Sequence, residues 1–259
     1  MALNELAQSF RDLHKPGQPL LLANVYDGIT ARAIASIGSC QALATSLSSV
    51  AAAQGLSPDR LDMDTNLRAG RVVARIARDF NLPLSIEFGS GYGDQLEQGM
   101  KQIIDLGAVG INLDDADTQT SKLYSIDEAA SRIRRAVRAS VSSGVPDFVV
   151  NARTDTLMHG GTIEDAITRG KAYLDAGAFN VFVLGGSERG GITTVEVMEL
   201  TEAFNGQLNV SVKLAKGGLT VKDLAGIGVS RCSIGPQLQF VGAKAAVEVA
   251  EEFLKGGLR

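Results

Sequence analysis

Residues 147–186 decide the fold class, and they read DFVVNARTDTLMHGGTIEDAITRGKAYLDAGAFNVFVLGG. The apolar runs at 147–155 and 179–186 have the length and the Val and Phe content of strands that are buried on both faces. Between them, Thr162 and Asp165 have the spacing of a helix-capping box, and Gly177 stands where the helix should end. The segment therefore predicts a strand, a helix and a second strand, as in a parallel sheet.

The same alternation runs through the rest of the chain. Further apolar runs of strand length are found at 19–27, 42–47, 82–89, 109–115, 208–214 and 229–236, and an amphipathic stretch of helix length follows each. Eight strand–helix units of even length favour a closed (β/α)8 barrel over a doubly wound open sheet. We therefore predict an α/β protein with a single domain over 1–259, in which an extra N-terminal helix (1–17) precedes a TIM barrel (18–259).

Composition excludes several classes of function. The chain has 259 residues with 25 Lys and Arg against 29 Asp and Glu, a net charge of −4, which argues against a nucleic-acid surface. No apolar run reaches the roughly 18 residues of a membrane span, and the first residues lack an apolar signal core. Cys40 and Cys232 form no CxxC pair, so a disulfide framework or cysteine zinc site is not expected. We expect a cytoplasmic protein with neither a nucleic-acid nor a membrane partner.

Polar residues gather where the predicted strands end, which is where a TIM barrel carries its active site. Several acids stand there with one arginine and one lysine. Converging carboxylates are ligands for Mg²⁺ or Mn²⁺, and an arginine can bind a carboxylate through two hydrogen bonds. The strand-end residues are Asn24, Asp27, Thr45, Ser46, Glu87, Asn112, Asp114, Asp115, Asn151, Arg153, Asp155, Asn209, Lys213 and Ser233.

Six stretches, in order along nearly the whole chain, resemble the isocitrate lyase/phosphoenolpyruvate mutase superfamily. They are LLLANVYDGITARAIASIG (20–38), ALATSLSSVAAAQGLSPD (42–59), SIEFGSGYGD (85–94), GAVGINLDD (107–115), VVNARTD (149–155) and LAGIGVSRCSIGP (224–236). The resemblance implies a TIM barrel that binds a 2-oxo acid or related carboxylate through Mg²⁺. It also implies a C–C or P–C bond made or broken next to the carbonyl through an enolate that the metal stabilises.

The resemblance also assigns roles to particular residues. Arg153 matches the arginine that holds the substrate, and Glu87 and Asp114 match acids of the metal site, so these three are the predicted catalytic residues. Asp59 matches an acid that reaches the metal through water. The predicted substrate contacts are Ser46, Leu47, Gly91, Tyr92, Arg153 and Asn209, and the predicted ligands of Mg²⁺ or Mn²⁺ are Glu87, Asp114 and Asp59. Asp115 is interpreted as a capping or supporting acid.

The sequence departs from the superfamily pattern in three places. The acidic strand usually carries Asp-x-Asp or Asp-x-Glu before Gly-Tyr-Gly, and here these positions are Glu87 and Gly89, so one acid is missing. The lyases' Cys-Gly-His loop is replaced by ADTQTSKLYSIDE (116–128), which disfavours isocitrate or methylisocitrate cleavage. The strand-6 position that is polar in relatives is Leu184. The pattern therefore favours a phosphoenolpyruvate phosphonomutase-like branch with a reduced metal motif.

These observations leave three functions open. The first is a lyase or mutase acting on a small phosphonopyruvate-, phosphoenolpyruvate- or oxaloacetate-like 2-oxo acid. The second is an inactive relative that binds a small carboxylate, and the third is a lyase that forms a Schiff base through Lys213. Residues 113–125 could form a lid through Thr118, Thr120 and Lys122, and KGG (216–218) resembles a phosphate-binding turn.

The resemblance further implies a homo-oligomer, a dimer or tetramer with helix exchange between subunits. The apolar C-terminal stretch VGAKAAVEVAEEFL (241–254) suits such an exchange.

Overall fold

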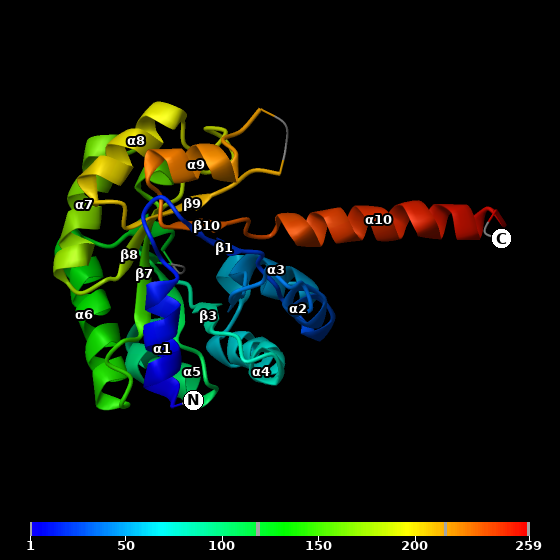
Figure 1. Cartoon of the computed structure of the whole chain (residues 1–259), viewed down its shortest axis with the longest axis horizontal. Helices are drawn as coiled ribbons and strands as arrows, with labels where there is room; N and C mark the ends of the chain where they lie inside the picture. The colour runs from blue at the N-terminus through cyan, green and yellow to red at the C-terminus, as the bar shows by residue number, and fades with distance from the viewer. Residues whose placement is uncertain (1, 118–119, 215–216, 258–259) are drawn as a thin grey trace.

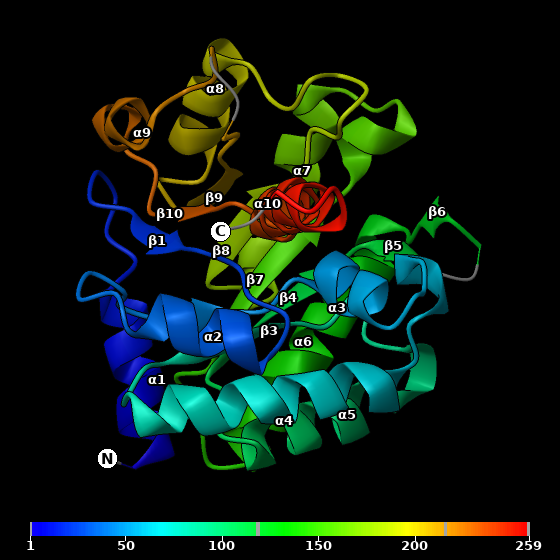
Figure 2. The ribbon, with the colours of Figure 1, turned by 90° about the vertical axis from the view of Figure 1, so that its right-hand side faces the viewer.

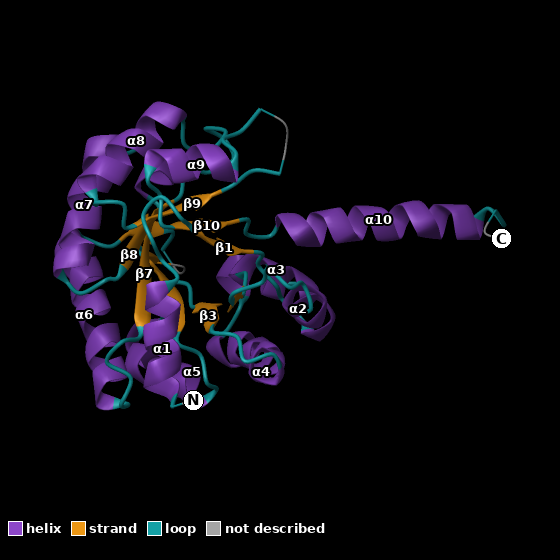
Figure 3. Ribbon diagram, in the orientation of Figure 1, coloured by secondary structure: helices purple, strands orange, loops and turns teal. Residues whose placement is uncertain are grey.

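The computed structural model describes residues 2–117, 120–214 and 217–257, and eight of its strands form a nearly closed parallel barrel (Figures 1 and 3). An isolated parallel bridge between Val25 and Thr45 joins the first strand to the second and completes the circle. This confirms the predicted TIM barrel. The strands, in their order around the barrel, are β1 (Leu20–Leu22), β10 (Arg231–Ser233), β9 (Leu208–Ser211), β8 (Asn180–Val183), β7 (Val149–Thr154), β4 (Gly110–Asp114), β3 (Leu84–Glu87) and β2 (Leu43–Ala44).

Helices that follow the strands cover the outside of the barrel. They are α2 (Gly28–Ala35), α3 (Leu47–Ala53), α4 (Met63–Asp79), α5 (Leu96–Asp105), α6 (Ile126–Ser142), α7 (Ile163–Asp175), α8 (Thr194–Ala203) and α9 (Val221–Ile227). The predicted capping box at Thr162 and Asp165 is present at the start of α7. Short 3-10 turns (Pro58–Arg60, Gly93–Gln95 and Thr156–His159) and a hairpin of β5 (Ala116–Asp117) with β6 (Lys122–Leu123) lie between these elements.

The predicted N-terminal helix is present as α1 (Leu3–Asp12), and it packs against the amino-terminal end of the barrel. Phe10 is completely buried there. Gly110, the first residue of β4, makes room for it, because a Cβ at this position would lie 2.8 Å from Cε1 of Phe10. His14 is buried directly after α1, where its Nδ1 lies 2.8 Å from the carbonyl oxygen of Phe10.

The last helix lies apart from the barrel of its own chain. The α10 helix (Gln237–Leu254) extends away from the barrel instead of covering it, and none of its residues is buried (Figures 1 and 2). Leu21, which points outward from β1, is 49 % exposed as a result. The amphipathic pattern correctly predicted a helix, but the barrel of the same chain does not bury its apolar face. Among the described residues, no helix combines the length and the apolar character that a membrane crossing needs.

Candidate active site

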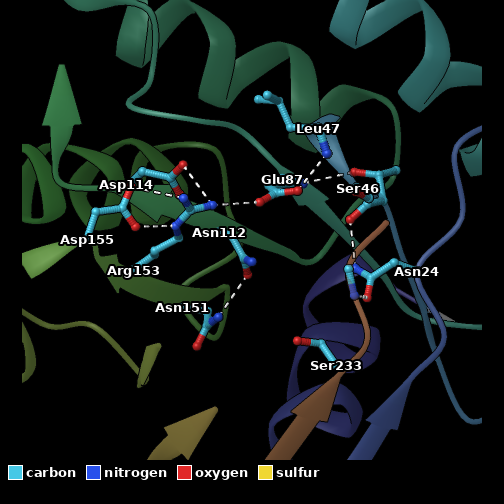
Figure 4. A network of polar contacts seen from close by, with 12 residues as sticks. Asn24, Ser46, Leu47, Glu87, Asn112, Asp114, Asn151, Arg153, Asp155 and Ser233 are labelled. Carbon is cyan, nitrogen blue, oxygen red and sulfur yellow. Dashed lines mark hydrogen bonds and ion pairs between the residues drawn. The ribbon is translucent and has the colours of Figure 1, made fainter. Parts of the chain in front are cut away.

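The site is centred on Arg153, near the carboxyl end of β7, whose guanidinium contacts three carboxylates (Figure 4). Nε and Nη2 donate to Oδ1 and Oδ2 of Asp155 at 2.6 and 2.9 Å. Nη1 lies 3.2 Å from Oε1 of Glu87 and 3.5 Å from Oδ2 of Asp114. The barrel thus brings together residues from β3, β4 and β7 that the strand-end pattern had predicted to meet.

Glu87 is held in the site by both its backbone and its carboxylate. Its backbone N–H donates to Oγ1 of Thr45 at 2.9 Å, and its carbonyl accepts from Nδ2 of Asn66 at 3.0 Å. Its Oε2 accepts a 2.6 Å hydrogen bond from the backbone N–H of Leu47. The Glu87 carboxylate therefore bridges Leu47 and Arg153, and only 13 % of the side chain is exposed.

Asp114 is the acid with the most unusual environment. Burial raises its pKa to about 8; the charge of Arg153 opposes this rise, and the neighbouring carboxylates of Asp155 and Glu87 add to it. Its Oδ1 is buried and has no hydrogen-bond partner among the described residues. The same acids, led by Asp114, outweigh the effect of burial on Arg153 and hold the pKa of its guanidinium well above the usual value. Arg153 therefore stays charged.

Asp115 stabilises the site by accepting hydrogen bonds from the residues that follow Arg153 and from α7. Its Oδ2 accepts from the hydroxyls of Thr154 and Tyr173, both at 2.6 Å, and lies 3.4 Å from Nη1 of Arg169. Its Oδ1 accepts from the backbone N–H of Asp155 at 2.9 Å. Through that bond Asp115 fixes the backbone of the residue that holds Arg153, which agrees with the supporting role predicted for it.

Below the carboxylates, the barrel interior is polar. Asn151 donates to Asn112 at 2.9 Å, and Asn180 donates to Asn151 at 3.2 Å. Arg231 is 1 % exposed, and its Nη2 donates to Oδ1 of Asn112 at 3.1 Å. Its Nε and Nη1 have no partner in the described part of the chain, and burial lowers its pKa to about 9 although the charge of Glu87 opposes this. A guanidinium thus lies inside the barrel without a directly paired acid.

The predicted substrate contacts lie in different surroundings. Ser46 is buried; its N–H donates to the carbonyl of Val25, and its Oγ accepts from Ser49 N–H at the start of α3. The N–H of Leu47 is bound to Glu87. Asn209 lies in the barrel interior, where its Nδ2 donates to Ser233 at 3.3 Å.

Gly91 and Tyr92 are set by the turn after β3. Gly91 has φ of +81°, and its N–H donates to the carbonyl of Phe88 at 3.1 Å. A Cβ at Gly91 would lie 2.6 Å from Leu96 Cδ1, so the position is closely packed. The ring of Tyr92 packs edge-on against Phe88, with 5.2 Å between the ring centroids. Their predicted substrate contacts stay predictions.

The predicted metal ligands do not converge. Glu87 and Asp114 both lie against Arg153, whereas Asp59 is exposed and lines a separate cavity of about 360 Å³ with Tyr92. Gly89, the position at which the superfamily resemblance predicts a second acid, has φ of +56°, which an acidic residue rarely adopts. In residues 2–117, 120–214 and 217–257, no three His, Cys, Asp or Glu side chains are grouped to hold a metal. As arranged, the three predicted ligands do not form one cluster, and Mg²⁺ binding by Glu87 and Asp114 stays a prediction.

Lys213 lies apart from the Arg153 group. It lines a cavity of about 470 Å³ together with Gly190, Gly191 and Ser211, and none of Glu87, Asp114 and Arg153 lines that cavity. The predicted lid residues Thr120 and Lys122 belong to the β5–β6 hairpin segment. Thr118 of the lid and Lys216 of the KGG turn lie outside the described residues.

Sequence reasoning missed two features of the site. Asp155 was recognised as a strand-end residue but not as the partner of Arg153; its position two residues further along the strand, and so on the same face, could have indicated it. Arg231 was not singled out. A lone arginine inside an otherwise apolar strand run (229–236) was the available signal, since such residues are rarely buried without a role.

Comparison with known proteins identifies relatives of this chain. The family model described as phosphoenolpyruvate phosphomutase matches residues 10–254. An uncharacterised protein of Mycobacterium tuberculosis H37Rv is 30 % identical over 252 residues, covering 96 % of this chain and 90 % of that protein. An oxaloacetate decarboxylase of Pseudomonas savastanoi pv. phaseolicola is 27 % identical, covering 96 % and 84 %. The 2-methylisocitrate lyase of Salmonella typhimurium is 30 % identical, covering 70 % and 63 %.

Solved structures have the same fold. A protein of Burkholderia cenocepacia J2315, provisionally named a phosphonomutase, superposes with a TM-score of 0.85 at 33 % identity, covering 99 % of this chain and all of that one. A phosphonopyruvate hydrolase solved with oxalate and Mg²⁺ has a TM-score of 0.83 at 25 % identity, covering 98 % and 88 %. These matches confirm the resemblance drawn from the six sequence stretches.

Proposed function

The chain belongs to the phosphoenolpyruvate phosphomutase family, and from this premise we propose that it is a lyase- or mutase-type enzyme acting on a small 2-oxo acid. The reaction would make or break a C–C or P–C bond next to the carbonyl of a phosphonopyruvate-, phosphoenolpyruvate- or oxaloacetate-like acid. Named relatives in the family are lyases and decarboxylases, which supports an enzyme of this general type.

The fixed guanidinium of Arg153 is the observation that carries this proposal. Asp155 holds Nε and Nη2, so Nη1 is the corner that faces the other acids and the N–H of Leu47 across the barrel mouth. A guanidinium nitrogen and a backbone N–H at opposite sides of one carboxylate are a suitable pair of donors for a ligand's carboxylate. The structure already has a carboxylate in this position, that of Glu87.

Arg153 can also contribute to the chemistry. Breaking a bond next to a carbonyl leaves negative charge on the carbonyl oxygen as the enolate forms. A cation held in place before the reaction stabilises that charge more in the transition state than in the bound substrate. Asp155 keeps Arg153 oriented, and the low exposure of the site (17 % for the Arg153 side chain) strengthens the interaction.

Mg²⁺ remains a prediction that rests on the resemblance. Because the three predicted ligands do not form one cluster among the described residues, no step of the reaction is assigned to a divalent ion. Glu87 and Asp114 are the residues through which Mg²⁺ dependence should be tested. The Schiff-base alternative has less support, since Lys213 lines a different cavity from Arg153.

Calorimetric titration with oxalate, which resembles the pyruvate enolate, tests the binding half of the proposal. We expect oxalate to bind the wild-type protein and Arg153→Lys to bind it at least tenfold more weakly, in buffers with and without Mg²⁺. Turnover of a panel of 2-oxo acids and phosphonates tests the catalytic half. Binding without turnover of any member would favour the inactive carboxylate-binding relative, and unchanged affinity in Arg153→Lys would refute the site.

We also propose that the protein is a homo-oligomer in which α10 packs on a second copy. Six large apolar side chains of α10 are 56–82 % exposed, namely Phe240, Val241, Val247, Val249, Phe253 and Leu254. The chain leaves a matching gap, because the outward face of β1 at Leu21 is exposed and α10 of the same chain does not cover it. Exchange of α10 between copies would bury both surfaces.

A further inference from the structure

The carboxylate of Glu87 makes the contacts that a bound ligand's carboxylate would make (Figure 4). Its two oxygens accept from two different elements, Oε2 from the N–H of Leu47 at 2.6 Å and Oε1 from Nη1 of Arg153 at 3.2 Å. These are the two donors that the proposed function assigns to the ligand. A ligand carboxylate and Glu87 therefore cannot both occupy them.

The length of the glutamate side chain makes this arrangement possible. The backbone of Glu87 is fixed by hydrogen bonds to Thr45 and Asn66 and by pairing with Asn112 on β4. An aspartate on the same backbone would have its carboxylate roughly 1.5 Å further back, one C–C bond shorter. From there it could not make both contacts. The longer side chain of glutamate therefore reaches both donors. Because the backbone is held, the carboxylate can leave them only by rotation of the side chain.

Arg231 provides a second place for the Glu87 carboxylate. It is buried inside the barrel, and its Nη2 is bound to Asn112, the residue that pairs with Glu87 across β3 and β4. Two other nitrogens of its guanidinium, Nε and Nη1, have no partner in the part of the chain that is described. Unpaired buried donors are costly, so a carboxylate that turned toward them would be stabilised.

We propose that Glu87 is an internal competitor for the ligand's carboxylate, which binds by displacing Glu87 from Leu47 and Arg153 toward Arg231. This rests on the proposed function, in which Arg153 binds the ligand. A tethered competitor acts at a high effective concentration, so a weakly held monocarboxylate cannot displace it. Glu87 is then a specificity-determining residue that favours ligands with two anionic groups, such as oxalate or a 2-oxo dicarboxylate.

Calorimetry in metal-free buffer tests the competition. Oxalate and acetate are titrated into the wild type, Glu87→Gln, Glu87→Ala and the control Glu199→Gln, an exposed acid on α8. We expect oxalate to bind both Glu87 variants at least tenfold more tightly than the wild type, acetate to gain measurable binding, and Glu199→Gln to behave as the wild type. The melting temperature of each variant shows that it is folded.

The role of Arg231 is tested by adding Arg231→Met to the wild type and to Glu87→Gln. If Arg231 receives the displaced carboxylate, Arg231→Met weakens oxalate binding in the wild type and has a much smaller effect in Glu87→Gln. An equal loss in both backgrounds would overturn the part assigned to Arg231. Should Arg231→Met fail to fold, Arg231→Lys gives the same comparison with the charge retained and the fork removed.

Two outcomes separate failure of this inference from failure of the proposed function. In the first, oxalate binds the wild type and loses affinity in Arg153→Lys while the Glu87 variants bind no more tightly; this overturns the competition and leaves the function intact. In the second, neither the wild type nor the Glu87 variants bind oxalate, with or without Mg²⁺; the proposed carboxylate site is then wrong and the competition falls with it.

Discussion

Asp155 orients Arg153 from two positions further along the chain, directly after β7, through hydrogen bonds of 2.6 Å from Nε to Oδ1 and 2.9 Å from Nη2 to Oδ2. Two parallel bonds fix the plane of the guanidinium as well as its position. The remaining corner, Nη1, is thereby directed at Glu87 and Asp114. The site is therefore built on the geometry of an arginine and not only on its charge.

This relationship predicts that Arg153→Lys is not a conservative change. A lysine keeps the positive charge but cannot form the paired bonds to Asp155. We expect oxalate affinity to fall ten- to a hundredfold by calorimetry and the melting temperature to drop by several degrees. Arg134→Lys, on the exposed face of α6, is the matched control and should change neither value. Full affinity in Arg153→Lys would show that the ligand does not depend on the paired geometry of Arg153, and it would refute the site.

Asp115 predicts a change in stability. Its carboxylate accepts from Thr154, Tyr173 and the N–H of Asp155, so the amide introduced by Asp115→Asn would place N–H groups against donors. We expect this variant to lower the free energy of unfolding by about 2–4 kcal/mol, as loss of buried charged hydrogen bonds usually does. Denaturant unfolding measures this, with Glu199→Gln as the control. A loss below ~1 kcal/mol would show that the network tolerates the amide.

The sequence located the site because parallel strands bring their carboxyl ends together. Glu87, Asp114 and Arg153 stand at the ends of predicted strands, and the sequence therefore predicts that they are neighbours. The pairing itself did not follow, because the choice among several acids depends on side-chain conformation and on the offset between strands. The family resemblance implies that Glu87 is a metal ligand, and this stays a prediction; in the structure its carboxylate binds Leu47 and Arg153.

The two terminal helices show the same limit of prediction from sequence: the pattern gives the helix but not its packing partner. The apolar spacing of residues 3–13 predicted α1 correctly, because its buried face is covered by the barrel of the same chain. The apolar spacing of 241–254 predicted α10, but periodicity states only that one face needs covering. It does not state which chain covers it.

His14 predicts a dependence of stability on pH. Burial, followed by the charge of Arg231, lowers its pKa from 6.5 to about 3. Between these values the unfolded chain binds a proton that the folded chain does not. The contribution of His14 to the free energy of unfolding is therefore complete above pH 6.5. It decreases as the pH falls toward 3, by up to about 1.4 kcal/mol per pH unit.

Replacement of the imidazole tests this dependence. In His14→Asn the amide can still donate to the carbonyl of Phe10, the contact that Nδ1 makes at 2.8 Å, but the side chain no longer titrates. We expect unfolding experiments at pH 7, 6 and 5 to show a steeper loss in the wild type than in the variant. His159→Asn, which changes the exposed histidine, is the control and should keep the wild-type slope. Parallel curves for His14→Asn and the wild type would rule out His14 as the source.

The exposed face of α10 predicts that single charges on it weaken self-association. Phe240 and Phe253 are 64 and 67 % exposed in one chain, and burial of a phenylalanine contributes about 1.5–3 kcal/mol. If a second copy covers them, Phe240→Glu or Phe253→Glu should raise the dissociation constant at least tenfold, because the glutamate would also have to be desolvated.

Met198→Glu places the same charge on an apolar residue of α8 that is 55 % exposed, and it should leave the assembly unchanged. Sedimentation velocity over a concentration series measures the three variants against the wild type. A monomeric wild type at micromolar concentration, or equal disruption by Met198→Glu, would show that α10 does not hold copies together.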